Sequence, residues 1–120
     1  MQQIIKGSNS VLLIESDKIE IFDAQSALDL MATARYEHEC DRIAINKSAI
    51  CEDFFVLSTG IAGEILQKFA NYRLKLAIYG DYSGYKSKAL HDFIYESNNG
   101  SSIFFTTTAE EAVERLVAAK

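Results

Sequence analysis

Two short segments of the sequence combine residue types that could bind an anion or a partner. The first is Ser58-Thr59-Gly60, which stands directly before an apolar pattern of helical spacing that begins at Ile61. A hydroxyl side chain at a helix start caps free backbone N–H groups, and this structural role is one interpretation. The same N–H groups and the helix dipole favour a bound anion or a phosphate on Ser58. Under this second interpretation, Ser58, Thr59 and Gly60 form a candidate binding or phosphoacceptor site.

The second segment is the loop from Gly80 to Lys88. It follows the apolar run Leu74 to Tyr79, which predicts a buried strand, and open α/β sheets bind ligands at the carboxyl ends of their strands. Tyrosines offer contact area and lysines can hold an anionic group, so the candidate recognition residues are Asp81, Tyr82, Tyr85, Lys86 and Lys88. The alternative is a solvated loop, in which Lys88 pairs with Asp92 and Asp81 caps a turn.

Catalytic and metal-binding patterns are weak by comparison. Asp81 with Lys86 could act as acid and base, but this combination is too common to specify a reaction. His38 and His91 each lack a second ligand at i+4, and no nucleophile elbow, dinucleotide fingerprint or P-loop occurs. We therefore expect no enzyme activity, no catalytic residues, no metal site and no cofactor.

Length and charge narrow the class of protein further. The chain has 120 residues, which predicts a single domain over residues 1–120, and a net charge of −5 without a basic run, which argues against nucleic acid as a partner. The longest apolar runs, 11–14 and 76–79, are too short to cross a membrane, and the N-terminal residues do not resemble a signal peptide. Cys40 and Cys51 have no CxxC spacing, so we expect reduced thiols and a cytoplasmic location.

The periodicity of apolar residues changes several times along the chain. Runs at Gln2–Lys6 and Val11–Glu15, separated by the turn-forming residues 7–10, predict a hairpin, and residues 19–22 a short third strand. Further strands are expected at 42–46, 74–79 and 102–106. Helices are expected after Asp23, from Ile61 with Ser58 or Thr59 as its cap, from Ser87, and from a capping box of Thr108 with Glu111.

This order defines the expected fold class. Strands that alternate with helices need crossover connections, which produce a parallel sheet with helices packed on it. The N-terminal hairpin adds an antiparallel pair. We therefore expect an α/β domain with a mixed sheet of about five strands and four helices, in the order β-β-α-β-α-β-α-β-α.

Several segments resemble the domain of unknown function 4180 family. They are Leu28-Asp29-Leu30-Met31, the long central motif from Thr59 to Phe69, Leu76 to Asp81, and Phe93 to Asn98. The resemblance extends from the first strand to the last helix. It implies a family but, by the family's own name, almost nothing about function.

The order of elements also resembles the STAS domain of anti-sigma factor antagonists. In that family a strand leads into a loop of the form Asp-Ser-Ser-Gly-Leu-Gly that opens a helix, and Leu57 to Ala62 stands at the corresponding place here. The phosphorylated serine of that family would correspond to Ser58. Leu57 replaces the aspartate of the loop, and the segment from Lys47 to Val56 is longer than the usual connection.

Two functions follow as expectations. The first is a non-catalytic regulatory module that presents Ser58-Thr59-Gly60 and the Asp81–Lys88 loop to an unidentified protein partner, with phosphorylation as a switch. The alternative is a protein that binds a small ligand, an anion or a metabolite, or a weak enzyme, with Tyr82 or Tyr85 in the wall of a pocket at the same rim. A homodimer through exposed Tyr82, Tyr85 and Tyr95 is a third possibility. The first expectation requires Ser58 and Asp81 to lie on the same side of the fold.

Overall fold

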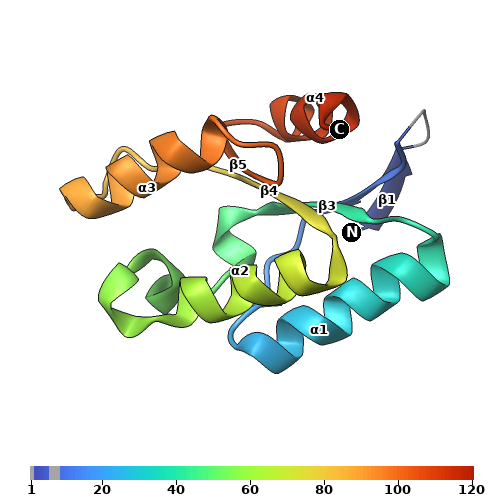
Figure 1. Ribbon diagram of the computed structural model, residues 1–120, viewed down its shortest axis with the longest axis horizontal. Helices are drawn as coiled ribbons and strands as arrows, with labels where there is room; N and C mark the ends of the chain where they lie inside the picture. Colours follow the sequence, from blue (N-terminus) through green and yellow to red (C-terminus); the bar gives the residue numbers. More distant parts are fainter. Residues whose placement is uncertain (1, 6–8) are drawn as a thin grey trace.

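A five-stranded mixed sheet forms the centre of the molecule (Figure 1). The computed structural model describes residues 2–5 and 9–120. The strands β1 (Gln2–Ile5), β2 (Val11–Ile14), β3 (Arg42–Asn46), β4 (Lys75–Tyr79) and β5 (Ile103–Thr106) lie side by side in chain order. β1 pairs with β2 in antiparallel orientation, and all other pairs are parallel. The expected mixed α/β class is confirmed, while part of the predicted hairpin turn lies outside the described residues.

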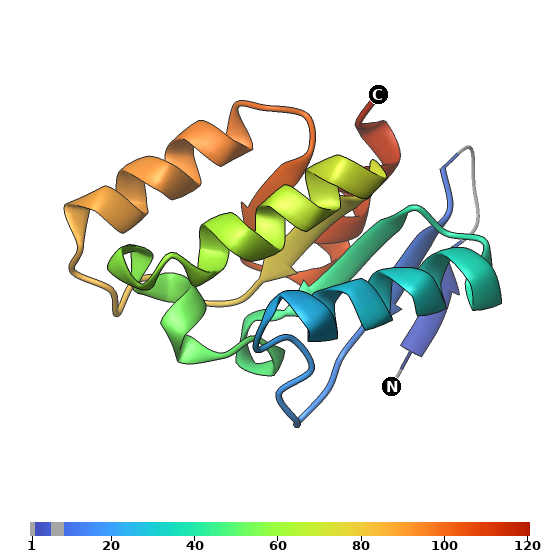
Figure 2. The same ribbon diagram turned by 60° about the horizontal axis from the view of Figure 1, so that its bottom comes forward.

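The sheet order determines where the helices lie. The helices are α1 (Ala24–Ala32), α2 (Ile61–Tyr72), α3 (Lys88–Asn98) and α4 (Ala109–Ala118). From β2 to β5 each parallel strand is followed by its neighbour on the same side. Because crossover connections are right-handed, the helices in all of these connections lie on one face of the sheet. Figure 2 shows α1, α2 and α3 together in front of the sheet and α4 behind it. The second face is therefore covered by the helix that follows the last strand.

The side chains of the strands alternate between two apolar clusters. Ile43 and Ile45 of β3, like Leu76 and Ile78 of β4, face α1, α2 and α3 in the larger cluster. The residues between them point to the other face, where the smaller cluster consists of Val11, Ala44, Ala77, Tyr79, Phe104, Ala112 and Leu116. Alanines at the centre of this second face let the backbone of α4 approach the sheet closely.

Arg42 of β3 links the C-terminal end of α4 to the sheet through hydrogen bonds. Its side chain is buried, and its Nη1 donates hydrogen bonds to the carbonyl oxygens of Leu116 and Ala119. Carbonyl groups in the last turn of a helix have no partner within the helix, and a cation there also interacts favourably with the helix dipole. The Arg42 Nε lies 3.5 Å from a carboxylate oxygen of Asp41 but makes no hydrogen bond among the described residues.

The predicted cap residues are confirmed at three helices and wrong at the fourth. The expected capping box at α4 forms only in part, because the Glu111 carboxylate accepts a hydrogen bond from the N–H of Thr107, one residue before the cap. Asp23, Ser87 and Thr108 accept hydrogen bonds from backbone N–H groups at the starts of α1, α3 and α4. At α2 the cap is Gly60, with a φ of +80° and no side-chain cap. Ser58 and Thr59 instead belong to a 3₁₀ turn, Leu57–Thr59, directly before it. Glycine adopts this left-handed conformation without strain, which explains why it stands here.

Arg73 ends α2 in the left-handed conformation, with a φ of 61°. Its side chain is exposed, so the conformation costs energy without a buried contact in return. We expect Arg73→Gly to stabilise the protein by about 0.5–1 kcal/mol, because glycine adopts this conformation freely and is preferred at this position. Urea unfolding of both proteins tests this, and an equal or lower free energy of unfolding for the variant would contradict it.

Two local features differ from the sequence prediction. The chain after α1 continues as a π-helical turn, Thr33–Glu37, before it reaches β3. The expected short strand at residues 19–22 is reduced to one bridge between Ile21 and Ile50. None of the helices in the described part of the chain has the length and apolar character needed to cross a membrane.

Candidate functional site at the carboxyl edge of the sheet

The two segments singled out in the sequence lie at the same edge of the sheet. Ser58–Gly60 precedes α2, which follows β3, and Gly80–Lys88 follows β4, the parallel neighbour of β3. Both segments therefore stand beyond the carboxyl ends of adjacent strands, where open α/β sheets bind ligands. We call these two segments the edge surface.

An aromatic cluster connects the edge surface to the core. Phe55, from the 3₁₀ turn Glu52–Phe55, stacks on Tyr85 with ring centroids 5.5 Å apart, and lies 6.2 Å from the ring of Tyr82. Tyr82 packs edge-on against Phe105 of β5 at 5.7 Å, and its hydroxyl donates to the carbonyl oxygen of Ile78. Tyr82 and Tyr85 are therefore partly buried, not exposed as the sequence suggested, and burial raises the pKa of Tyr82.

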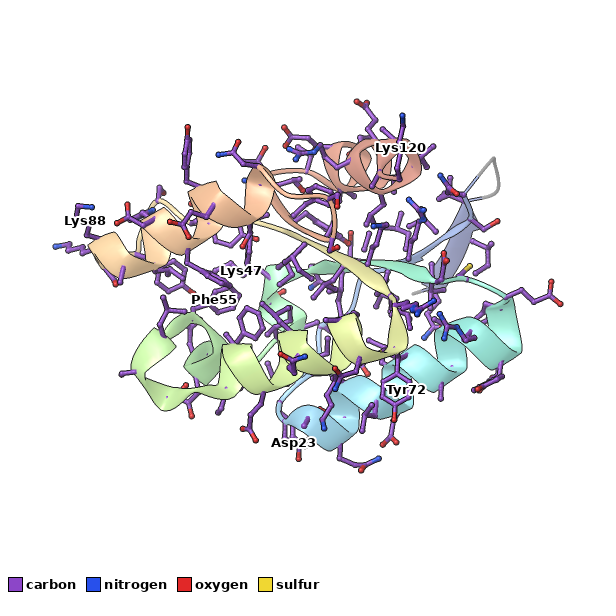
Figure 3. All side chains as sticks on the ribbon, in the orientation of Figure 1. Asp23, Lys47, Phe55, Tyr72, Lys88 and Lys120 are labelled. Atoms are coloured by element: carbon purple, nitrogen blue, oxygen red, sulfur yellow. The ribbon has the colours of Figure 1, made fainter. Side chains whose placement is uncertain are left out.

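Lys47 joins the same cluster from the end of β3. Its Nζ lies 4.8 Å from the ring centroid of Tyr85 and 5.4 Å from that of Phe55, and Figure 3 shows Lys47 beside Phe55, between α3 and the turns that precede α2. Glu52 completes the arrangement, because its carboxylate lies 4.0 Å from the Lys47 Nζ and accepts a hydrogen bond of 2.9 Å from the Tyr85 hydroxyl. The loop after β4 is thus held to the turn Glu52–Phe55 by stacking, charge and a hydrogen bond.

Thr59 holds the other half of the edge surface to that turn. Its hydroxyl lies 2.8 Å from the carbonyl oxygen of Asp53 and 2.9 Å from that of Val56. The same oxygen accepts a longer hydrogen bond of 3.3 Å from the N–H of Ile61, the first residue of α2. Ser58 next to it is exposed. Thr59 is therefore a structural residue, while the Ser58 hydroxyl is accessible to solvent.

The loop after β4 also contains the local contacts expected of a solvated loop. Lys88 pairs with Asp92 at 2.7 Å, which raises the pKa of the lysine, and His91 Nε2 lies 2.6 Å from the carbonyl oxygen of Tyr85. Asp81 accepts a hydrogen bond of 2.9 Å from the N–H of Ser83 and so caps the turn. These contacts confirm the alternative interpretation of Lys88 and Asp81, and they leave Lys86 exposed.

Hydrogen bonding from Ser83 lowers the pKa of Asp81, with a smaller contribution from the charge of Lys47. We expect Ser83→Ala to raise this pKa toward the ordinary value of an aspartate, because the side-chain hydrogen bond is its largest cause. A lowered carboxyl pKa adds stability at pH values above the ordinary pKa, and this stability is lost as the pH falls through the lowered value. Carboxyl ¹³C NMR titration of both proteins measures the shift, and an unchanged Asp81 pKa would contradict the assignment.

A cleft of about 990 Å³ opens at this edge of the sheet. Its lining comes from the segments that follow β2, β3 and β4, namely residues 15–18 with Glu20, residues 46–48, and residues 79–81. Of the predicted site residues, Asp81 lines it, whereas Tyr82, Tyr85, Lys86, Lys88 and the segment Ser58–Gly60 do not. The expected pocket wall with Tyr82 or Tyr85 is therefore not part of this cleft.

The charge of the cleft is mainly negative. Its lining includes four carboxylates, of Glu15, Asp17, Glu20 and Asp81, and two lysines, Lys18 and Lys47. Tyr79 forms a buried part of the wall, with its hydroxyl donating to the carbonyl oxygen of Ile14, and burial together with the charge of Glu15 raises its pKa to about 12. Gly80 fits because a Cβ there would stand 2.6 Å from the Cβ of Lys47.

Several residues of this edge were not among the candidates predicted from the sequence. Lys47, Glu52 and Phe55 organise the edge surface, and Glu15, Asn46 and Tyr79 shape the cleft. Asn46 holds the segment after β2, since its side chain accepts a hydrogen bond from the N–H of Ser16 and donates one to its carbonyl oxygen. For Glu15, Asn46, Lys47 and Tyr79 the available signal is their position at or directly after the carboxyl ends of predicted strands, whereas Glu52 and Phe55 lie in a segment without a periodic pattern.

Metal binding has no support in the described residues. Within residues 2–5 and 9–120, no group of three or more His, Cys, Asp and Glu side chains is arranged to hold a metal ion. Cys40 is buried, with its Sγ 3.4 Å from the carbonyl oxygen of His38, and Cys51 is half-buried.

The fold and the edge described above define an α/β domain with an open carboxyl edge. Comparison with protein families identifies a match over residues 6–116 to the family described as "Domain of unknown function (DUF4180)", and the chain belongs to this family. The resemblance seen in the sequence motifs is thereby confirmed. Comparisons with curated proteins and with solved structures found no match.

Proposed function

We propose that the chain is a non-catalytic regulatory module that binds a protein partner through the edge surface. The main support for this proposal is that the two segments of the edge surface, Ser58–Gly60 and Gly80–Lys88, both contact the same turn, Glu52–Phe55. Thr59 bonds to the carbonyl of Asp53, and Tyr85 bonds to Glu52 and stacks on Phe55. A surface held in one conformation loses little entropy on binding, which favours a specific partner.

Phosphorylation of Ser58 is the proposed switch. Ser58 is exposed and stands two residues before Gly60, which caps the start of α2 without a side-chain hydrogen bond. A phosphate on Ser58 would add up to two negative charges near the positive end of the helix dipole, and so change the charge of the edge surface. The STAS-like arrangement and the cytoplasmic location belong to the same proposal. The element order supports the STAS-like arrangement. The spacing of Cys40 and Cys51, which is not that of a CxxC motif, supports the location.

Affinity capture from the lysate of the organism that makes the protein, followed by mass spectrometry, tests the proposal. The baits are the tagged wild type, Ser58→Glu, and Ser101→Glu, which adds the same charge at an exposed position before β5, at the opposite edge of the sheet. We expect a stoichiometric partner on the wild type and on Ser101→Glu that is lost on Ser58→Glu. Capture that is equal on all three baits, or absent on all, would contradict the switch.

A second candidate function is small-ligand binding, or weak catalysis, in the carboxyl-edge cleft. The volume of about 990 Å³ supports it, since it is at the upper end of the range for small-molecule sites. The excess of carboxylates over lysines in the lining favours a cationic ligand over the anion that the loop lysines suggested. The shift in Tm on adding spermidine, a cation, or citrate, an anion, distinguishes the two kinds of ligand. A rise in Tm with spermidine that is smaller in Glu20→Gln would support this candidate.

A further inference from the structure

A second pocket lies at the opposite end of α2, away from the edge surface. It has a volume of about 310 Å³ and lies between α1, with the π-helical turn that follows it, and the C-terminal end of α2. Leu28, Met31 and Leu74 form apolar walls, and Tyr36 and Tyr72 supply two aromatic rings. Figure 3 shows Tyr72 at the end of α2 next to α1, far from Lys47 and Phe55.

The π-helical turn after α1 contributes the polar side chains at one end of this pocket. Thr33–Glu37 forms that turn, which contains Arg35 and Tyr36, and both of these residues line the pocket together with Leu28, two turns earlier on α1. Insertions of π-helical turns into α-helices are frequent at functional sites, because the additional residue redirects the side chains that follow.

Arg35 is the feature of this pocket that points to a ligand. Its side chain is half-buried, and the ion pairs in the described part of the chain are those of Arg42, Lys47 and Lys88, so the Arg35 guanidinium has no carboxylate partner there. Asp29, on the pocket rim, accepts a hydrogen bond of 2.9 Å from the side chain of Gln25. A guanidinium presents a planar set of donors that matches a carboxylate in two parallel hydrogen bonds.

The two tyrosines indicate what kind of group would carry this carboxylate. Tyr36 is 81% exposed and Tyr72 is 52% exposed, although they lie beside apolar walls. Tyrosine rings stack favourably on planar aromatic rings in offset or edge-on geometry. The pocket volume is at the lower end of the range for small-molecule sites, which suits one ring or two fused rings.

We propose that this pocket binds a small planar aromatic carboxylate. The ring lies between the two tyrosines and the apolar walls, and the carboxylate pairs with Arg35. The proposal is independent of the partner-binding function, because none of these residues belongs to the edge surface.

NMR titration with 1-naphthoate tests the site. The probe is added to ¹⁵N-labelled protein, with 1-naphthalenemethanol as the uncharged analogue of the same ring system. Arg35→Gln removes the charge with a small change in side-chain length, and Tyr72→Leu removes a ring at an exposed position. Lys68→Gln is the matched control, since it removes a positive charge from α2 outside the pocket.

We expect saturable shifts at Leu28, Ala32 and Tyr72 in the wild type and in Lys68→Gln. Arg35→Gln should weaken the affinity for 1-naphthoate by about tenfold and leave that for 1-naphthalenemethanol unchanged, because a charge-assisted hydrogen bond is lost. Tyr72→Leu should weaken both ligands by about fivefold through the lost stacking. Shifts that do not saturate or that spread over the surface would overturn the proposal, as would an equal loss in Lys68→Gln. Shifts that depend on protein concentration without ligand would instead assign the pocket to a second copy of the chain.

Discussion

Phe55→Ala is expected to reduce the free energy of unfolding by about 3–5 kcal/mol, the usual cost of truncating a fully buried phenylalanine. Phe55 is 2% exposed and contacts Phe54, Tyr82, Tyr85 and Lys47. The substitution leaves a cavity in the aromatic cluster and removes the stacking partner of Tyr85. Urea unfolding measures the loss. Tyr95→Ala is the matched control, because Tyr95 is 70% exposed and truncating it should change stability by less than about 0.5 kcal/mol.

The same variant tests whether the edge surface behaves as one unit. If Phe55 joins its two halves, amide hydrogen exchange in Phe55→Ala should accelerate both at residues 52–60 and at residues 80–88, and more than the global loss of stability requires. Acceleration in one segment alone would mean that the halves are held separately. The proposed mode of partner binding would then lose its main support.

Arg42→Met is expected to reduce the free energy of unfolding by about 3 kcal/mol, because two charge-assisted hydrogen bonds to the end of α4 are lost. Methionine fills much of the same volume but leaves the carbonyls of Leu116 and Ala119 without these donors. For a domain of this size the change corresponds to about 10 °C in Tm. Differential scanning calorimetry measures it.

Lys68→Met is the control for Arg42→Met, since it replaces a cation on α2 with the same side chain at a half-buried position. We expect it to change stability by no more than about 0.5 kcal/mol. Burying a guanidinium is costly, and its Nε lacks a hydrogen bond among the described residues. Equal stability of Arg42→Met and the wild type would show that this cost cancels the contribution of the two hydrogen bonds.

The sequence predicts the regular elements well because their apolar patterns are local. The apolar run of β4 and the stripe on α2 match the structure within one residue at the ends that were predicted. Caps formed by Asp23, Ser87 and Thr108 were also predictable, because each bonds to a residue three positions later. Family membership followed from motifs that lie within single elements.

The segment between β3 and α2 was not predictable in the same way. Its three 3₁₀ turns have neither helical nor strand periodicity, and Phe55 and Glu52 are fixed by Tyr85, about thirty residues later in the chain. The cap of α2 was misassigned because the Thr59 hydroxyl bonds to the carbonyls of Asp53 and Val56, and the turn ends at Gly60. The cleft combines three segments, so it required the strand order.

The position of α4 has a consequence for how the protein is made. A nascent chain that has left the ribosome as far as β5 contains every strand and the three helices of one face, but Val11, Ala44, Ala77 and Phe104 still face water. An uncovered apolar sheet face is prone to associate with other chains. Chains stalled or cleaved before Ala109 should therefore be substrates for chaperones or proteases, and translation through α4 becomes the step that commits the molecule to its native state.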